Sequence, residues 1–297
     1  MGEKIKVAPP FGITLDRKRK HNILICGTNT SMTDNILNDY LISVLLNESS
    51  TVYCIDGDVL VGDDTSEEFY GVLSEKTGKF HAASSRADIV MFIHEIYEEY
   101  QRRKRTSEKS TICVVIKNLQ YTDIIKAMFK GERIDEREFL ESEEELVEAE
   151  EQQQVENVEL DPMDIFAAFN SVVASRNAKK EERSVKVSSS GYSNDKILKL
   201  IDDGSGFGIH FVVTSSDYQT VKETMRFGEN ILAKFPERFV FSLSNTDADN
   251  LVEGVSVASL NSNIVYYTDG VRETFQLKPY IAPSPDATAV YFDSISD

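Results

Sequence analysis

The chain is 297 residues long, with 41% apolar and 28% charged side chains, which is typical of a soluble protein large enough for one sizeable domain. Its formal net charge of −18 argues against a protein that coats DNA through a basic surface. No apolar run approaches the ~20 residues of a membrane span and no secretory signal is recognisable, so the sequence predicts a cytoplasmic location without direct membrane insertion.

In the first half of the chain, apolar runs alternate with segments of helical spacing. Continuous apolar runs predict strands buried on both faces of a parallel sheet at 22–27, 51–56 and 111–116. An edge strand is expected at 11–15. Apolar residues recurring every three or four positions predict helices at 33–47, 66–72, 87–105 and 121–129.

An acidic segment interrupts this alternation. Between Glu132 and Asp164 there are fifteen Asp and Glu and two Arg, and the run EEELVEAEEQQQ has too little apolar surface to fold alone. We therefore predict a partly disordered insertion over 130–192, with a short helix at 164–176, rather than a second domain.

Regular elements return after the insertion. Helices are predicted at 194–202, 217–226 and from about 245, and strands at 209–215 and 238–243. Asp269-Gly270 predicts a hairpin between strands at 264–268 and 272–280. We expect a single α/β domain over 1–282, with a mostly parallel central sheet flanked by helices and a C-terminal β-hairpin, followed by a loose tail at 283–297.

The stretch ICGTNTSMTDN at 25–35 lies between a strand and a helix, which is the layout of a phosphate-binding loop. In the frame G-x-x-x-x-G-K-[ST], Gly27 matches the first Gly, but Met32, Thr33 and Asp34 replace the second Gly, the Lys and the hydroxyl residue. Asp34 repels phosphate and is expected to cap the helix instead. A degenerate cradle would consist of Gly27, Thr28, Asn29, Thr30, Ser31, Thr33 and Asp34. A plain helix-capping turn and a weakened nucleotide pocket remain alternatives.

Several segments in order resemble the FtsK/SpoIIIE/HerA-type P-loop motor ATPases. NILICGTNTSMTDN is similar to their strand and Walker A loop, TICVVIKN falls at their Walker B strand, and LIDDGSGFGIHFVVTSS and FPERFVFSLSNTDADNLV are similar to later segments. The resemblance covers roughly 20–130 and 194–280 and implies a RecA-like P-loop NTPase fold. The family includes DNA translocases and the ATPases of type VII secretion.

The departures from the family lie at its chemistry. Lys117 and Asn118 replace the Walker B acids that hold Mg²⁺ and activate water, and Ser215 stands where the family has a Gln that senses the terminal phosphate. Because these losses accompany the missing Walker A lysine, the resemblance implies a pseudo-ATPase. No bound cofactor is expected, with ATP and Mg²⁺ as the disfavoured alternative. Arg238 is a candidate for an inter-subunit contact, with a structural salt bridge as the alternative.

The predicted function is a structural or regulatory module of a DNA-translocase or type VII secretion motor. Its expected partners are a homologous active ATPase module or other translocation components, and the chain could be a fragment of a membrane-anchored protein. An active, DNA-binding motor and a protein-interaction module without a motor partner are the alternatives. DNA contact would fall on the basic stretches 17–20 and 102–105.

Metal and thiol chemistry are not expected. The four histidines lack zinc-site spacing, so no metal site is predicted. Cys26, Cys54 and Cys113 each lie in a different apolar run and are predicted to be buried free thiols.

Overall fold

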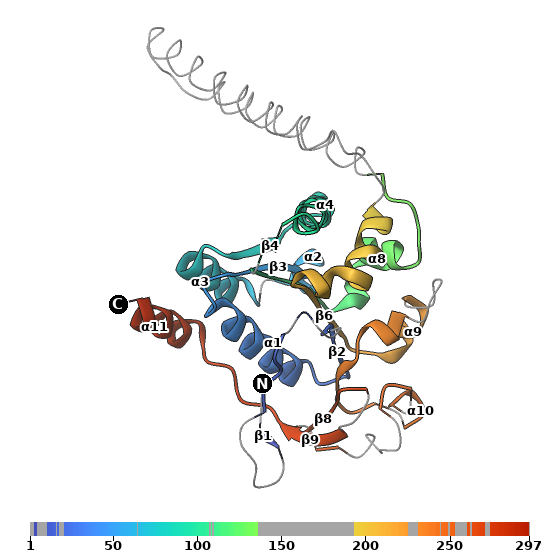
Figure 1. Cartoon of the computed structure of the whole chain (residues 1–297). Helices are drawn as coiled ribbons and strands as arrows, with labels where there is room; N and C mark the ends of the chain where they lie inside the picture. Colours follow the sequence, from blue (N-terminus) through green and yellow to red (C-terminus); the bar gives the residue numbers. More distant parts are fainter. Residues whose placement is uncertain are drawn as a thin grey trace, which may run out of the picture.

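A mixed β-sheet runs through the centre of the molecule (Figure 1). The computed structural model describes residues 3–4, 11–15, 17, 21–63, 65–106, 108, 110–135, 193–224, 231–243, 245–248, 250–252, 260–261, 263–270 and 274–296. Within these residues the sheet has nine strands in the order β1-β9-β8-β7-β2-β6-β5-β3-β4. The strands are β1 Glu3–Lys4, β2 Ile23–Cys26, β3 Ser50–Asp56, β4 Phe80–Ala83, β5 Thr111–Lys117, β6 Ile209–Ser215, β7 Glu237–Val240, β8 Val265–Thr268 and β9 Thr274–Lys278.

The strands from β7 to β4 are parallel, which the continuous apolar sequences of β2, β3, β5, β6 and β7 predict, whereas β4 is not predicted from the sequence. β8 and β9 form the antiparallel hairpin expected around Gly270, which has a φ of +69°. The edge strand predicted at 11–15 is wrong, since only Phe11 makes a bridge. Its ring instead packs on Phe239, Tyr267 and Phe275 at centroid distances of 4.5–6.4 Å.

Helices cover both faces of the sheet (Figure 1). One face is covered by α1 Thr30–Leu45, α3 Glu67–Thr77 and α11 Pro285–Ser296. The other is covered by α4 Arg86–Arg103, α5 Asp123–Phe129, α8 Ser193–Asp203 and α9 Tyr218–Thr224. The short α-helices are α2 Gly57–Leu60 and α10 Asn245–Ala248, and the 3-10 helices are η1 Leu119–Tyr121, η2 Gly204–Phe207 and η3 Ile231–Lys234.

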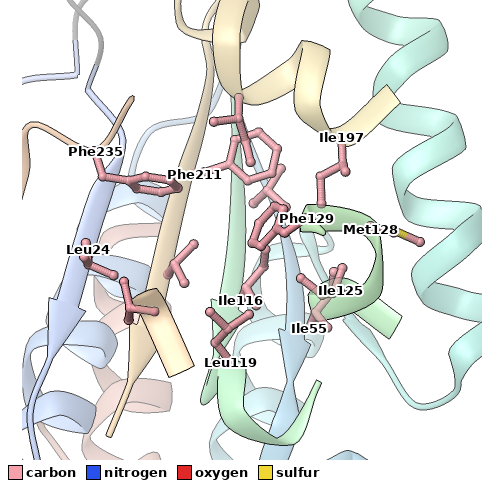
Figure 2. Close-up of a cluster of buried hydrophobic side chains, with 14 of the residues drawn as sticks. Leu24, Ile55, Ile116, Leu119, Ile125, Met128, Phe129, Ile197, Phe211 and Phe235 are labelled. Atoms are coloured by element: carbon pink, nitrogen blue, oxygen red, sulfur yellow. The ribbon is translucent and has the colours of Figure 1, made fainter. Parts of the chain in front are cut away.

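Successive side chains of the central strands enter opposite cores. Leu24, Ile116 and Phe211 contribute to the core beneath α5 and α8, where Figure 2 shows them with Phe129 and Ile197. The apolar residues that alternate with them along these strands face α1 and α3. Leu24, Ile116 and Phe211 are fully buried at 0% exposure, and burying each such side chain stabilises the fold by roughly 1.5–3 kcal/mol. The two cores hold the strand ends in fixed positions.

The loose tail predicted at 283–297 is wrong for the part that the structure describes. Residues 285–296 form α11, which packs on α3 and buries Thr288 and Phe292, and Lys76 of α3 pairs with Asp293 at 2.8 Å. Ser284 begins the helix by accepting from the Ala287 N–H. The bulk of the predicted insertion, including the helix at 164–176, lies outside the described residues.

Candidate functional site

The carboxyl ends of β2, β6, β5 and β3 lie side by side at one edge of the sheet. Gly27 follows β2, Ser215 ends β6, Lys117 ends β5 and Asp56 ends β3. In open α/β sheets this edge is where ligands bind. The sequence-predicted loop at 27–34 and the Walker B position are therefore neighbours in space.

Packing between strands accounts for Gly27. Its φ of +148° and its contact with Phe241 exclude a side chain, because an added Cβ would lie 2.5 Å from the Phe241 Cβ. The Gly27 N–H donates to the Ser215 carbonyl at 3.0 Å, and the Thr28 hydroxyl donates to the Ser242 carbonyl at 3.2 Å. The first glycine is thus used to bring β2, β6 and β7 together.

The helix after Gly27 starts too early for a phosphate cradle. α1 begins at Thr30, and the Asn29 side chain caps it by accepting from the Met32 N–H at 3.2 Å. Among residues 28–33, all of which the structure describes, none has a positive φ. A loop that wraps its N–H groups around phosphates needs such angles. Thr30 and Ser31 are exposed on the first turn and Thr33 is buried in the helix.

The prediction that Asp34 caps this helix is wrong. Asn29 is the cap, and Asp34 lies in the second turn with its carboxylate 3.5 Å from the Lys117 ammonium. Because α1 begins three residues before its predicted start, Asp34 is carried past the cap position and faces the end of β5.

Lys117 is the centre of a cluster of carboxylates. Its Nζ lies 3.1 Å from Asp56 Oδ2 and 3.1 Å from Asp58 Oδ2, and it donates to the Ser66 hydroxyl at 2.9 Å. The side chains of Lys117 and Asp56 are 4% and 1% exposed, so this is a buried ion pair. Together with Asp34, three carboxylates surround one ammonium, which leaves an excess of negative charge when all are ionised.

Electrostatics keeps the ammonium charged. Burial alone would lower the pKa of Lys117, but Asp56, Asp34 and Asp58 outweigh this and raise the pKa above its ordinary value. For Asp34, desolvation is the largest influence and raises the carboxyl pKa, against the opposing effect of Lys117. A buried lysine normally tends to lose its proton, so the carboxylates are what make it a permanent cation here.

Neighbouring groups fix the carboxylates in place. The Tyr70 hydroxyl donates to Asp56 Oδ2 at 2.7 Å, and the Asp58 N–H donates to Asp56 Oδ1 at 2.9 Å. Asn118, at a left-handed φ of 52°, donates from its side chain to Asp58 at 2.7 Å and from its N–H to the Thr214 hydroxyl at 2.8 Å. Within the described part of the chain, no group of three His, Cys, Asp or Glu side chains is arranged to hold a metal ion.

Two solved structures share this fold. The cytoplasmic domain of EssC aligns with 94% of this chain and 41% of its own length, at 11% identity and a TM-score of 0.54. The cytoplasmic domain of the type VII secretion ATPase EccC from Thermomonospora curvata aligns with 98% of this chain and 30% of its own, at 10% identity and a TM-score of 0.55. The chain has the fold of a secretion ATPase domain.

This likeness confirms the fold that the sequence resemblance implied. No protein-family model and no curated protein sequence matches the chain. It spans less than half the length of EssC or EccC. Within the described residues, no helix is both long and apolar enough to cross a membrane.

The remaining predicted site residues make contacts within the fold. Ser215 is 3% exposed and its hydroxyl donates to the Asp217 carbonyl at 3.0 Å. Arg238 is half-buried on β7 and donates to the carbonyls of Phe235 and Leu251, both at 2.9 Å. These hydrogen bonds join Arg238 to carbonyl groups of its own chain, and both the inter-subunit contact and the structural salt bridge stay predictions.

Arg17, the described residue of the basic stretch 17–20, lies close to the basic stretch at the end of α4. Arg17 and the buried Arg103 both donate to the Ser110 carbonyl, at 3.1 and 2.8 Å. Arg102 pairs with Glu99 and Glu108 at 2.6 and 3.2 Å. Two of these arginines are thus neutralised or buried within the fold, and DNA contact stays a prediction.

The sequence prediction missed the partners of Lys117. Asp56 and Asp58 belong to IDGD at the end of β3, which the structure places beside β5 with Asp56 opposite Lys117. A usable signal was present, because polar residues that end adjacent parallel strands meet at one edge of the sheet. Ser66 and Tyr70 carried no such signal, since their positions depend on how α3 packs.

Proposed function

We propose that this chain is a nucleotide-independent module with an ATPase fold, which acts as a structural or regulatory part of a type VII secretion or DNA-translocase motor. The observation that carries the proposal is the position of the Lys117 ammonium. At the end of β5, this ammonium lies 3.5 Å from the Asp34 carboxylate and 3.1 Å from the Asp56 carboxylate.

The resemblance to motor ATPases gives this position its meaning. In those proteins, the residue aligned with Asp34 and the residue aligned with Lys117 hold Mg²⁺ from two sides. Here the two side chains contact one another directly. An ammonium group therefore takes the place of the divalent cation, and because it is covalently part of the chain it cannot carry a nucleotide in or out.

Phosphate binding is also opposed at this edge. The positive charge of the Walker A lysine is missing, and α1 has Asn29 as its cap. A phosphate 4 Å from the half-exposed Asp34 carboxylate would be repelled by about 4 kcal/mol at an effective dielectric constant near 20. Lys117 offsets little of this repulsion, because Asp56 and Asp58 already pair with it.

A fold retained without its phosphate chemistry favours a role in assembly. We propose that the chain binds a homologous ATPase module with an intact P-loop, or another component of the same motor, and that it does so without ATP or Mg²⁺ of its own. The shared fold with EssC and EccC domains supports this, since both are parts of longer chains.

ATP turnover by the purified chain tests the proposal. We expect release of phosphate from Mg-ATP at background rate, for the wild type and for Ser31→Glu alike. Ser31 is exposed on the first turn of α1, where a carboxylate suits the helix dipole and repels phosphate, so the variant is a folded negative control. Turnover above background that Ser31→Glu abolishes would establish an active motor instead.

Partner capture tests the second half of the proposal. With the tagged chain as bait in its native host, we expect recovery of a chain that carries an intact GKS loop, in equal amounts with and without ATP. Capture that requires ATP, or capture of proteins without any P-loop ATPase among them, would contradict the proposed role and favour an interaction module outside a motor.

A further inference from the structure

The strand β4 presents an open edge. In the part of the chain that the structure describes, β4 is the last strand of the sheet and pairs with β3 alone. The Val52 N–H donates to the Lys79 carbonyl at 2.9 Å, and Val52 is paired with Phe80. In a parallel ladder this register directs the N–H and C=O groups of Phe80 and Ala82 away from β3. Each has one donor and one acceptor to offer.

A hollow of about 370 Å³ adjoins the same two residues. Its walls come from α2, α3 and β4, and include Val59, Glu67, Tyr70, Gly71, Phe80 and Ala82. Phe80 and Tyr70 pack together at a centroid distance of 5.1 Å and form an apolar floor, while Ala82 is exposed. The hollow is therefore apolar at its base and open towards the strand edge.

Gly71 keeps this hollow open. It lies in the interior of the 11-residue helix α3, where a glycine costs about 1 kcal/mol relative to alanine. No atom lies within 4 Å of the place where its Cβ would be, so packing does not require a glycine here. The missing side chain leaves room beside the strand edge instead.

Charge at the rim limits what can bind. Glu67 lines the hollow, and Glu68 and Asp63 are exposed nearby in sequence. A segment bound along the edge would meet negative charge where it passes the first turn of α3. A basic residue complements that charge.

We propose that the β4 edge and its hollow bind an extended peptide segment of a partner protein. The segment adds a strand to the sheet through the outward backbone groups of Phe80 and Ala82, places one apolar side chain in the hollow, and carries a basic residue beside Glu67. Main-chain hydrogen bonds supply affinity and the hollow supplies specificity in this mode of recognition. This peptide-binding site goes beyond the proposed function as a nucleotide-independent module of a motor, and it does not depend on Lys117.

Two variants interfere with the two halves of the proposed site. Gly71→Leu fills the hollow from open space, and leucine is a better helix former than glycine, so α3 is preserved. Ala82→Pro removes an outward N–H without removing a bond to β3, and proline is tolerated on edge strands in that orientation. Gly71→Ala is the matched control, since it stabilises α3 but adds only one methyl group. Circular dichroism and thermal melts check that all three fold.

The probe is a random heptapeptide library displayed on phage and selected on the full chain. We expect enriched peptides with a basic residue and an apolar anchor, whose synthetic versions bind Gly71→Leu and Ala82→Pro at least ten-fold more weakly than wild type. Binding to Gly71→Ala should stay within about two-fold, and N-methylation of alternate backbone amides of the peptide should abolish binding. The proposal is overturned by a selection without enrichment, or by peptides that bind both variants as tightly as wild type.

Discussion

Replacing Lys117 with methionine removes the one cation at the centre of the carboxylate cluster while keeping the length of the side chain. Asp56, whose side chain is 1% exposed, would lose its partner at 3.1 Å and keep only the Tyr70 hydroxyl and the Asp58 N–H as donors. Leaving a buried charge without its partner costs about 3–5 kcal/mol. At roughly 2–4 °C per kcal/mol for a domain of this size, the melting temperature should fall on the order of 10 °C.

A double-mutant cycle with Asp56→Asn isolates the interaction. Asparagine keeps an acceptor for Tyr70 and removes the charge, so Lys117→Met with Asp56→Asn should be more stable than Lys117→Met alone by about 1–3 kcal/mol. Urea denaturation followed by far-UV circular dichroism measures all four proteins.

The reasoning would be refuted by a Lys117→Met variant within about 0.5 kcal/mol of wild type, or by effects of the two changes that simply add. Either result would mean that water reaches the cluster and that the ammonium does not hold the strand ends together.

Three further outcomes are expected. The raised pKa of Asp34 makes its ionisation unfavourable in the folded state, so the free energy of unfolding falls as pH rises from the unfolded pKa to the folded one. Asp34→Asn should therefore be at least as stable as wild type at pH 7, and the urea midpoints of the two proteins should converge at a pH below both pKa values. A clear loss of stability in Asp34→Asn at pH 7 would contradict this. Burial raises the pKa of Cys54 and Cys113 to about 12 and also raises that of Cys26. Ellman's reagent at pH 8 should therefore react quickly with no thiol of the native chain and with three thiols of the chain in guanidinium chloride. Fast reaction with the native chain would mean that a thiol lies at the surface. Phe292→Ala should cost about 3 kcal/mol of stability because this ring of α11 is 4% exposed, whereas Tyr291→Ala, at a half-exposed ring, should cost under 1 kcal/mol. Equal small losses of stability for the two variants in thermal melts would mean that α11 is not docked on the rest of the fold.

The buried strands could be predicted because each is a continuous apolar run with a polar end. NILICG and TICVVI became β2 and β5 with little change of boundary. Their position in one parallel sheet followed from the alternation with helices. The residues that end these strands, such as Lys117, are equally visible, which is why the sequence alone predicts a departure from motor ATPases at this position.

The contacts of Lys117 could not be predicted in the same way. Asp34 lies 83 positions earlier in the chain, and its approach depends on α1 beginning at Thr30 rather than at 33. That start is decided by Asn29, which is one of several possible caps in TNTSMTDN. The partner Asp56 required the neighbour order of β3 and β5, which local patterns do not specify.

The helix α11 has a recognisable start in the sequence, but its apolar stripe is too short to predict a helix. Ser284-Pro285 is a typical start for a helix, with a capping hydroxyl and a proline in the first turn. The segment that follows has only Thr288 and Phe292 deeply buried, so its apolar stripe is too short to stand out by periodicity. Packing on α3, a tertiary contact, determines this helix.

Thermal unfolding with and without 1 mM ATP and 5 mM Mg²⁺ tests the central claim most directly. A ligand that binds the native state with a Kd of about 10 µM would stabilise it by about 2.7 kcal/mol at this concentration, a shift of several degrees. On the proposal that the Lys117 ammonium takes the place of the divalent cation, and because Asn29 caps α1, we predict no shift for the wild type or for Ser31→Glu. A saturable rise in the wild-type midpoint that Ser31→Glu abolishes would show that this edge of the sheet still binds nucleotide.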